Sequence, residues 1–273
     1  MINIELNNGT TIPALGFGVF KVADGKECVN AVKEALKVGY RHIDTAAIYR
    51  NEKSVGHAIK ESGIPREEIY LTTKLWNDVQ RGGVAEEALN KSLEDLQVDY
   101  IDLYLVHWPV PGKYAETWLA MEKLLAGGKV KTIGVSNFHE HHLDDVKKIW
   151  SVVPAVNQIE LHPELSQKPL IQRCKEDGIT VQSWSPLGAA KNDLLVNPVI
   201  RAIGEKYNKT NAQIILRWNI EQGIVTLPKS VTPSRIKENF EIFDFALTLE
   251  EMEQINGLNK DLRVGADPDN FNF

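Results

Sequence analysis

The feature that most constrains the fold of this chain is a regular alternation between two kinds of segment. Short apolar runs are typical of buried strands, and longer segments with apolar residues three or four positions apart are typical of helices. Strands are predicted at residues 14–19, 40–43, 69–74, 101–106, 129–135, 155–159, 180–182 and 224–227. Helices are predicted at residues 27–38, 52–61, 84–96, 114–125, 142–149, 168–176 and 233–239, with two more inside 198–220.

The strand–helix pairs follow one another without an intervening linker, which predicts one domain over residues 1–273. Because eight parallel strands joined by helices close into a cylinder, we expect an α/β fold of the (β/α)8 or TIM-barrel type rather than an open sheet. Residues 2–12, turned at Asn7-Asn8-Gly9, predict an N-terminal β-hairpin. Extra helices are predicted near the C-terminal end, the last at residues 249–258.

Charge and cysteine content narrow the class of protein. The net charge of -6 argues against a broad nucleic-acid-binding surface. Cys28 and Cys174 have neither metal-ligand spacing nor the pattern of a disulfide framework. The first residues lack the features of a signal peptide, and no apolar run approaches the roughly 18 residues of a membrane span. We therefore expect a soluble cytoplasmic protein with no membrane or nucleic-acid partner.

Four polar residues, Asp44, Tyr49, Lys74 and His107, follow predicted strands, whose C-terminal ends converge in a barrel. A lysine beside a tyrosine favours the phenolate, so Lys74 is predicted to lower the Tyr49 pKa from its usual value near ~10. Asp44 would hold Lys74, and His107 would donate a hydrogen bond to an oxygen that gains charge. Each residue alone also fits a structural ion pair or a buried histidine, but the four together favour general acid catalysis by Tyr49.

Such chemistry needs a cofactor, because no side chain transfers a hydride. Gly16-Phe17-Gly18 is only a fragment of the dinucleotide fingerprint, and it lies inside a predicted strand. A Rossmann site is therefore not expected. In barrels, phosphate groups commonly bind near the loops after strands seven and eight.

The loop after the predicted eighth strand has the features of an anion site. Thr232 is a plausible N-cap and Pro233 fits the first helical position, so free main-chain N–H groups would face an anion. Lys229 and Arg235 add two cations. An ordinary capped surface helix is the alternative interpretation.

Taken together, these segments resemble the aldo-keto reductase family over nearly the whole chain. The resemblance rests on these motifs: GYRHIDTA at 39–46, Tyr49 with NE at 51–52, TKLW at 73–76, VHWP at 106–109, IGVSNF at 133–138, NQIE at 157–160, HP at 162–163, WSPLG at 184–188 and residues 229–239. It is similar to bacterial and protozoal members that reduce small ketoaldehydes, diketogluconates or prostaglandin precursors. It implies an NADPH-dependent enzyme, often a monomer, that reduces small carbonyl compounds to alcohols.

The resemblance also implies roles for individual residues. Asp44, Tyr49, Lys74 and His107 take the catalytic positions. The implied cofactor contacts are Ser136, Asn137 and Gln158 at the carboxamide, Trp184 on the nicotinamide ring, Ser185 and Leu187 at the pyrophosphate, Lys229, Ser230, Val231 and Arg235 at the 2'-phosphate, and Glu238 and Asn239 at the adenine. The implied pocket residues are Phe20, Trp76, His107 and Trp108. The short tail after residue 258 suggests an open pocket with few specificity contacts.

Other functions are weighed against this one. His139, His141 and His142 look like a metal cluster but also suit an exposed helix start, and no metal is expected. A non-enzymatic binding or structural role is a further alternative, since the family includes channel subunits and lens proteins, but the intact set of four catalytic positions argues against it.

A metal-dependent hydrolase on the same barrel is another alternative. It would use His42, His107 and His162 as ligands. Such enzymes often need paired ligands at the first strand end, where this chain has Gly18, Val19 and Phe20.

Overall fold

The computed structural model describes residues 2–273, and its main feature is a parallel sheet of eight strands in sequential order. The strands are β3 (Phe17–Gly18), β4 (His42–Asp44), β5 (Tyr70–Leu75), β6 (Ile101–Val106), β7 (Val130–Ser136), β8 (Val156–Glu160), β9 (Thr180–Trp184) and β10 (Val225–Leu227). A parallel bridge from Leu15 to Thr226 joins the two edges. The main-chain N–H of Gly16 also donates to the Thr226 carbonyl, at 3.0 Å. The sheet therefore closes, which confirms the predicted barrel.

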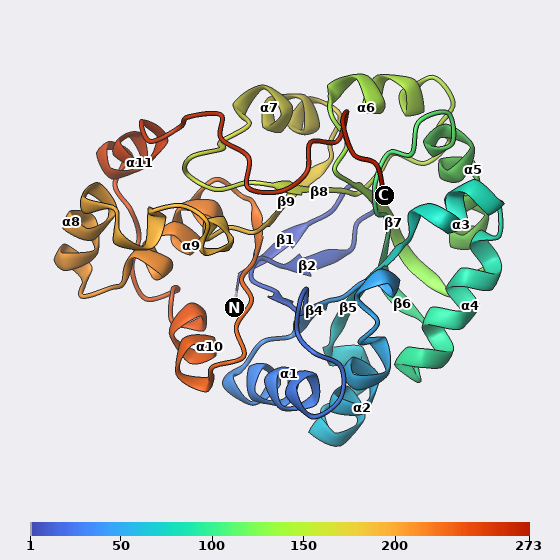
Figure 1. Cartoon of the computed structure of the whole chain (residues 1–273), viewed down its shortest axis with the longest axis horizontal. Helices are drawn as coiled ribbons and strands as arrows, with labels where there is room; N and C mark the ends of the chain where they lie inside the picture. The colour runs from blue at the N-terminus through green and yellow to red at the C-terminus, as the bar shows by residue number, and fades with distance from the viewer. Residues whose placement is uncertain (1) are drawn as a thin grey trace.

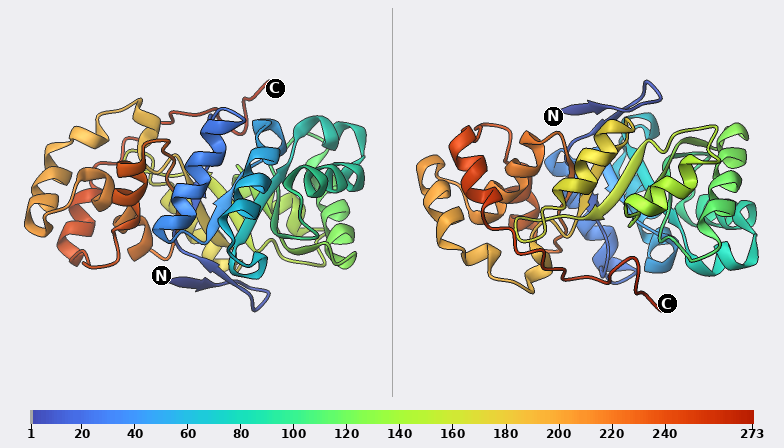
Figure 2. Two further views of the ribbon diagram at one scale, coloured as in Figure 1. Left: turned by 90° about the horizontal axis from the view of Figure 1, so that it is seen from below. Right: turned by 90° about the horizontal axis from the view of Figure 1, so that it is seen from above.

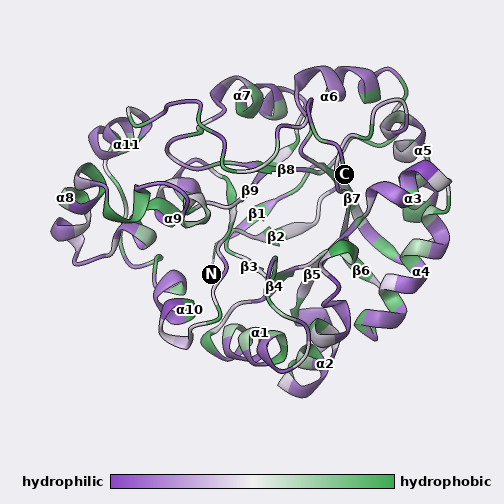
Figure 3. Ribbon diagram, in the orientation of Figure 1, coloured by the Kyte–Doolittle hydropathy of each residue, from purple (hydrophilic) through white to green (hydrophobic). Residues whose placement is uncertain are grey.

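Helices surround the barrel, as Figure 1 shows. They are α1 (Lys26–Val38), α2 (Glu52–Ser62), α3 (Asn77–Gly82), α4 (Ala85–Leu96), α5 (Tyr114–Ala126), α6 (Glu140–Lys147), α7 (Lys168–Glu176), α8 (Pro198–Tyr207), α9 (Asn211–Glu221), α10 (Pro233–Phe240) and α11 (Leu249–Asn256). The amphipathic pattern predicted all of these except α3, a single short polar segment without apolar periodicity. In Figure 3 the helices carry both hydrophobic and hydrophilic residues, as expected for segments with one buried face.

The two ends of the chain lie on opposite faces of the barrel, as Figure 2 shows. The predicted hairpin is present as β1 (Asn3–Glu5) and β2 (Thr11–Pro13). Its Ile12 is fully buried against Leu103, Leu105 and Val225. The hairpin thus plugs the end of the barrel where the strands begin and leaves the other end for chemistry.

The tail after α11 runs back across the face where the strands end (Figures 1 and 2). The main-chain N–H groups of Val264 and Gly265 donate to the buried Glu160 carboxylate at 2.6 and 3.0 Å. The expectation that a short tail leaves the pocket open is therefore wrong, because the tail crosses the mouth of the barrel. None of the helices within residues 2–273 has the length and apolarity of a membrane span.

The packing of α2 on α4 depends on the absence of a side chain at Gly56. A Cβ atom there would lie 2.2 Å from the Leu96 main-chain oxygen. We expect Gly56→Ala to destabilise the fold by about 2–3 kcal/mol and to lower Tm by roughly 5–10 °C in a thermal melt. Gly82→Ala is the matched control, because the nearest atom to its Cβ is 3.6 Å away. Equal melting temperatures for the Gly56 variant and the native protein would show that the helices separate without cost.

Candidate active site

The four predicted catalytic residues converge at the C-terminal ends of three adjacent strands. Asp44 ends β4, Lys74 lies near the end of β5, His107 follows β6, and Tyr49 ends the 3-10 turn η1 (Ala47–Tyr49). The Lys74 Nζ donates to Asp44 Oδ1 at 2.6 Å, and it lies 5.1 Å from the centre of the Tyr49 ring. The Tyr49 and His107 rings are 5.8 Å apart, edge to face. Lys74 is fully buried, so its charge acts on its neighbours with little screening by water.

Burial determines the protonation states of Tyr49 and His107 at neutral pH. It raises the pKa of Tyr49 well above its usual value near 10, and the Asp44 carboxylate raises it further. The predicted net lowering by Lys74 is therefore wrong for this structure, because burial and the Asp44 charge outweigh the nearby cation. Burial, with Lys74 nearby, holds the pKa of His107 well below its usual 6.5. At neutral pH the phenol is thus protonated and the imidazole is uncharged.

A second layer of polar residues holds Asp44 and Lys74 in place. The Gln158 Nε2 donates to Asp44 Oδ2 at 2.8 Å and to Gln182 Oε1 at 2.9 Å. The Thr45 carbonyl accepts a second hydrogen bond from Lys74 at 2.8 Å. Burial lowers the pKa of Lys74, and Asp44 opposes that shift. The sequence did not single out Gln182 or Thr45, since neither carries a signal beyond its place in a strand or loop.

Glu52 is a further buried carboxylate behind the site. Its oxygens accept hydrogen bonds from Thr73 Oγ1 at 2.6 Å and Ser92 Oγ at 3.3 Å. Burial raises its pKa, and these two hydrogen bonds oppose that shift. Its charge favours the ammonium form of Lys74, so it belongs to the same electrostatic group.

The residues expected at a nicotinamide carboxamide lie side by side at the ends of β7, β8 and β9. The Asn137 Nδ2 donates to the His107 carbonyl at 2.9 Å, and its Oδ1 accepts from Trp184 Nε1 at 2.8 Å. The Ser136 Oγ donates to the Gln158 carbonyl at 2.8 Å. Asn137 has a φ of 64°, a left-handed conformation that asparagine tolerates better than most residues. These bonds tie the cofactor candidates directly to the strand that carries His107.

The loop after β9 has an unusual backbone and unsatisfied polar atoms. Ser185, Ala189 and Ala190 have φ values of 48°, 51° and 54°. The Asn192 Nδ2 and Oδ1 atoms are both buried without a hydrogen-bond partner within residues 2–273. Leu187, between these positions, packs against the core. Such a loop suits a polar ligand that would satisfy the amide.

The start of α10 presents free positive charge. Lys229 and Arg235 are exposed, and neither forms an ion pair with an acidic residue in the described part of the chain. The predicted side-chain cap by Thr232 is wrong, because the Thr232 hydroxyl makes no cap. Instead the Ser230 Oγ accepts from the Thr232 main-chain N–H at 3.1 Å, which shapes the turn before the helix. Pro233 begins the helix as predicted.

The other residues expected near the adenine and the 2'-phosphate also lie on or before α10. Val231 is exposed and Asn239 is buried. The Glu238 Oε1 accepts from Thr210 Oγ1 at 2.7 Å. That contact holds the Glu238 carboxylate against the N-cap residue of the neighbouring helix α9.

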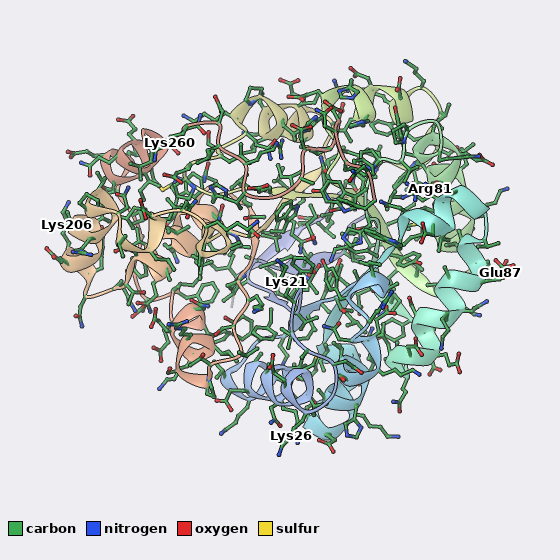
Figure 4. All side chains as sticks on the ribbon, viewed as in Figure 1. Lys21, Lys26, Arg81, Glu87, Lys206 and Lys260 are labelled. Atoms are coloured by element: carbon green, nitrogen blue, oxygen red, sulfur yellow. The ribbon has the colours of Figure 1, made fainter. Side chains whose placement is uncertain are left out.

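Aromatic residues surround the catalytic group. The Phe20 ring lies 4.9 Å from Tyr49, and Trp76 lies 5.1 Å from His107. Trp108 is mostly buried. Lys21, whose Nζ is 5.4 Å from the Phe20 ring, projects near the middle of the barrel in Figure 4, whereas Glu87, Lys206 and Lys260 lie at its edge.

Two aromatic residues that the sequence did not indicate complete this wall. Phe273 stacks on Trp76 at 5.8 Å, and Phe271 lies 5.2 Å from Trp108. They come from the tail, more than 160 positions later in the chain, and no local pattern links them to the pocket.

The histidines of the hydrolase alternative do not form one site. His42 is fully buried and its Nε2 pairs with Thr72 Oγ1 at 3.1 Å. His162 pairs with the Glu160 carboxylate instead. Within residues 2–273, the group of metal-ligating side chains that does converge is His139, His141, His142 and Asp269, none of which belongs to the hydrolase alternative. The structure therefore gives the hydrolase alternative no support.

A family comparison identifies this arrangement. The model described as "Aldo/keto reductase family" matches residues 14–260. The chain belongs to the aldo/keto reductase family. The resemblance drawn from the motifs is thereby confirmed, and the family supports an oxidoreductase that reduces carbonyl groups.

Individual relatives cover the chain almost end to end. It is 52% identical to glyoxal reductase of Bacillus subtilis, over 99% of this chain and 97% of that protein. It is 50% identical to 9,11-endoperoxide prostaglandin H2 reductase of Trypanosoma cruzi, over 98% of this chain and 95% of that protein. The crystal structure of MGS-M4, an aldo-keto reductase from a Medee basin deep-sea metagenome library, superposes with a TM-score of 0.96 at 46% identity, covering 99% of this chain and all of that one (100%).

Proposed function

We propose that this aldo/keto reductase uses NADPH to reduce small aldehydes and ketones to alcohols, with Tyr49 as the general acid. The observation that carries the proposal is the buried group in which Lys74 joins Asp44 beside the Tyr49 ring, with His107 opposite. Ketoaldehydes and other 1,2-dicarbonyl compounds are the proposed substrate class. The names of relatives such as glyoxal reductase and methylglyoxal reductase DkgA of Escherichia coli support that choice.

Each residue of the group has a separate task in this proposal. Tyr49 keeps its phenolic proton at neutral pH and gives it to the carbonyl oxygen as that oxygen gains charge. The neutral His107 imidazole donates a hydrogen bond that orients the same oxygen. The Lys74 ammonium stabilises the phenolate that Tyr49 leaves behind, and Asp44 keeps Lys74 in place. NADPH, when bound, supplies the hydride.

The residues present fit this cofactor. Asn137, Gln158 and Trp184 would hold the nicotinamide end, beside His107. The unsatisfied Asn192 amide suits a polar ligand in the loop after β9. Lys229 and Arg235, exposed at the start of α10, suit a phosphate group.

The proposal is tested with purified protein and a panel of carbonyl compounds, read by the loss of NADPH absorbance. We expect turnover with small 1,2-dicarbonyl compounds and with aromatic aldehydes. No consumption of NADPH with any member of the panel, by a protein that melts cooperatively, would contradict the proposal and favour the non-enzymatic alternative.

The preference for NADPH over NADH gives a second prediction. A hydrogen bond to a charged group contributes roughly 1.5–3 kcal/mol, so Arg235→Ala should weaken NADPH binding about 10- to 100-fold. NADH, which lacks the 2'-phosphate, should lose much less, and the NADPH effect should shrink at high salt. Fluorescence titration with both cofactors measures the difference. Lys237→Ala, which removes a cation paired with Glu241 from the same helix, should change neither affinity. Equal losses for the two cofactors in Arg235→Ala would show that Arg235 does not read the 2'-phosphate.

A further inference from the structure

The tail is anchored near the pocket by a cluster of three histidines around one carboxylate. His139 precedes α6, while His141 and His142 lie in its first turn. The two carboxylate oxygens of Asp269 lie 3.1 Å from His139 Nδ1, 3.0 Å from His141 Nε2 and 3.5 Å from His142 Nε2. Because Asp269 belongs to the tail, this contact joins two segments 130 residues apart.

The hydrogen bonds around this cluster determine which ring nitrogens of His139 and His142 carry a hydrogen atom. The Arg263 Nη2 lies 2.9 Å from His139 Nε2, and a guanidinium only donates, so Nε2 is the acceptor. The neutral His139 ring then carries its hydrogen on Nδ1, which faces Asp269. The His139 main-chain N–H donates to His142 Nδ1 at 3.1 Å, so the hydrogen of His142 is on Nε2, which also faces Asp269. Two rings therefore point N–H groups at the carboxylate.

This placement of the ring hydrogens favours the binding of an anion and disfavours the binding of a metal ion. A metal binds the lone pair of an imidazole, whose other nitrogen usually donates to an acceptor outside the site. Here the outer nitrogens of His139 and His142 accept hydrogen bonds instead. A metal would have to displace Arg263 and break the main-chain bond at the start of α6. The cluster is thus built to hold the carboxylate of Asp269.

The surrounding groups agree with an ionised Asp269 carboxylate. Although partial burial acts in the opposite direction, the hydrogen bond from His139 and the three neighbouring imidazoles lower the pKa of Asp269. Burial and the nearby His141 lower the pKa of His142 to about 4. Asp145, which accepts a hydrogen bond from Tyr114, is the other carboxylate near these rings.

The anchor lies next to the two tail residues that pack on Trp76 and Trp108. Asp269 precedes Phe271 by two positions and Phe273 by four. The main-chain oxygen of Phe273 accepts hydrogen bonds from Asn77 Nδ2 at 3.0 Å and Arg81 at 3.1 Å. Glu160 holds the other end of the segment at Val264. Asp269 is the side-chain anchor between these two attachment points.

We propose that Asp269 and its three histidines form a latch that fixes residues 264–273 as the outer wall of the substrate pocket. Asp269 is thus a positioning residue that sets the preference for small over bulky carbonyl compounds. A small substrate gains contact with Phe271 and Phe273 only while the latch is closed, whereas a bulky substrate has to displace them. The predicted substrate preference rests on the proposed function, whereas the attachment of the tail through Asp269 does not.

The first test of the latch needs no activity. Chymotrypsin cleaves after aromatic residues, so cleavage at Phe271, followed by mass spectrometry of the intact protein, reports release of the tail. We expect Asp269→Ala to be cleaved there several times faster than the native protein. Asp144→Ala is the matched control. It removes a carboxylate of α6 that pairs with Arg173 and not with the histidines. Equal cleavage rates for the native protein and Asp269→Ala would overturn the latch.

The second test measures kinetics with saturating NADPH. Because the anchor is half exposed, its loss should raise KM for a small dicarbonyl roughly three- to tenfold, with kcat within about twofold. KM for a bulky aromatic aldehyde should rise less or fall. Faster cleavage with an unchanged ratio of the two KM values would overturn the assignment to specificity. A native protein that reduces neither compound would contradict the proposed function, and the cleavage test would still decide the latch.

A zinc titration against a chromophoric chelator tests whether the histidine cluster binds a metal ion. We expect no tight stoichiometric binding by the native protein. Tight binding of one zinc ion that is lost in His141→Ala would show that the cluster is a metal site and would overturn the latch as described.

Discussion

Tyr49→Phe is expected to lower carbonyl reduction by roughly 10²–10⁴-fold, the usual contribution of a general acid. The phenylalanine keeps the ring that packs against Phe20 and His107 and removes only the phenolic oxygen and its proton. The rate is measured with NADPH and substrate both saturating, so that the loss falls on kcat. The variant should fold normally, because the change removes one hydroxyl from a partly buried ring without opening a large cavity.

The control for this prediction is NADPH affinity, measured by fluorescence titration of the same variant. It should stay close to that of the native protein, since Tyr49 is assigned to the substrate oxygen and not to the cofactor. Undiminished turnover with the cofactor saturating would remove Tyr49 from the role of acid. A parallel loss of NADPH binding would mean that the residue holds the cofactor instead.

Lys74→Met is expected to lower both activity and stability. The substitution leaves Asp44 buried, with Gln158 as its remaining side-chain donor within residues 2–273. Removing one partner of a buried ion pair costs about 3–5 kcal/mol, which corresponds to a fall in Tm on the order of 10 °C. Thermal melts at several pH values measure this loss. Asp44→Asn should affect activity in the same direction but more weakly, because Lys74 stays in place.

The pH dependence of Lys74→Met has a definite sign. Without its ion-pair partner Lys74, the Asp44 carboxylate is a buried charge, and burial favours the uncharged form of a carboxyl group. A group with a raised folded pKa destabilises the protein above that pKa, and the penalty is relieved as the carboxyl is protonated at lower pH. The stability gap between native protein and variant should therefore be largest at neutral pH and should narrow on acidification. A gap that stays constant with pH would mean that Asp44 finds another partner.

The pH–rate profile is the second readout for Lys74. Removing the cation should raise the Tyr49 pKa further, so the loss of reduction at high pH should move to higher pH while the maximal rate falls. An unchanged profile would show that Lys74 does not act on Tyr49.

The barrel and the convergence of Asp44, Lys74 and His107 were predictable because both depend on local order along the chain. Each strand pairs with the next in sequence, so a polar residue at one strand end lies beside the residue at the following strand end. Asp44, Lys74 and His107 are placed together by that rule alone. The short helix α3 was missed because six residues give no periodic pattern to read.

The details that were wrong depend on three-dimensional surroundings. The direction of the Tyr49 pKa shift is set by burial and by the Asp44 carboxylate, which outweigh the proximity of the Lys74 cation. The Thr232 hydroxyl makes no cap at the start of α10, where the Ser230 Oγ accepts a hydrogen bond from the Thr232 main-chain N–H. Composition alone does not show which of the possible contacts forms in the folded protein.

The sequence by itself determined the barrel, its family and the four polar residues at the strand ends, since periodicity and motif spacing are local properties of the chain. Only the tertiary structure decided the position of the tail. Residues 264–273 have no periodic pattern, and their place depends on Glu160, on the histidines before and within α6, and on Trp108. These contacts join positions about 100 or more residues apart, and folding of the whole barrel is what brings them within reach.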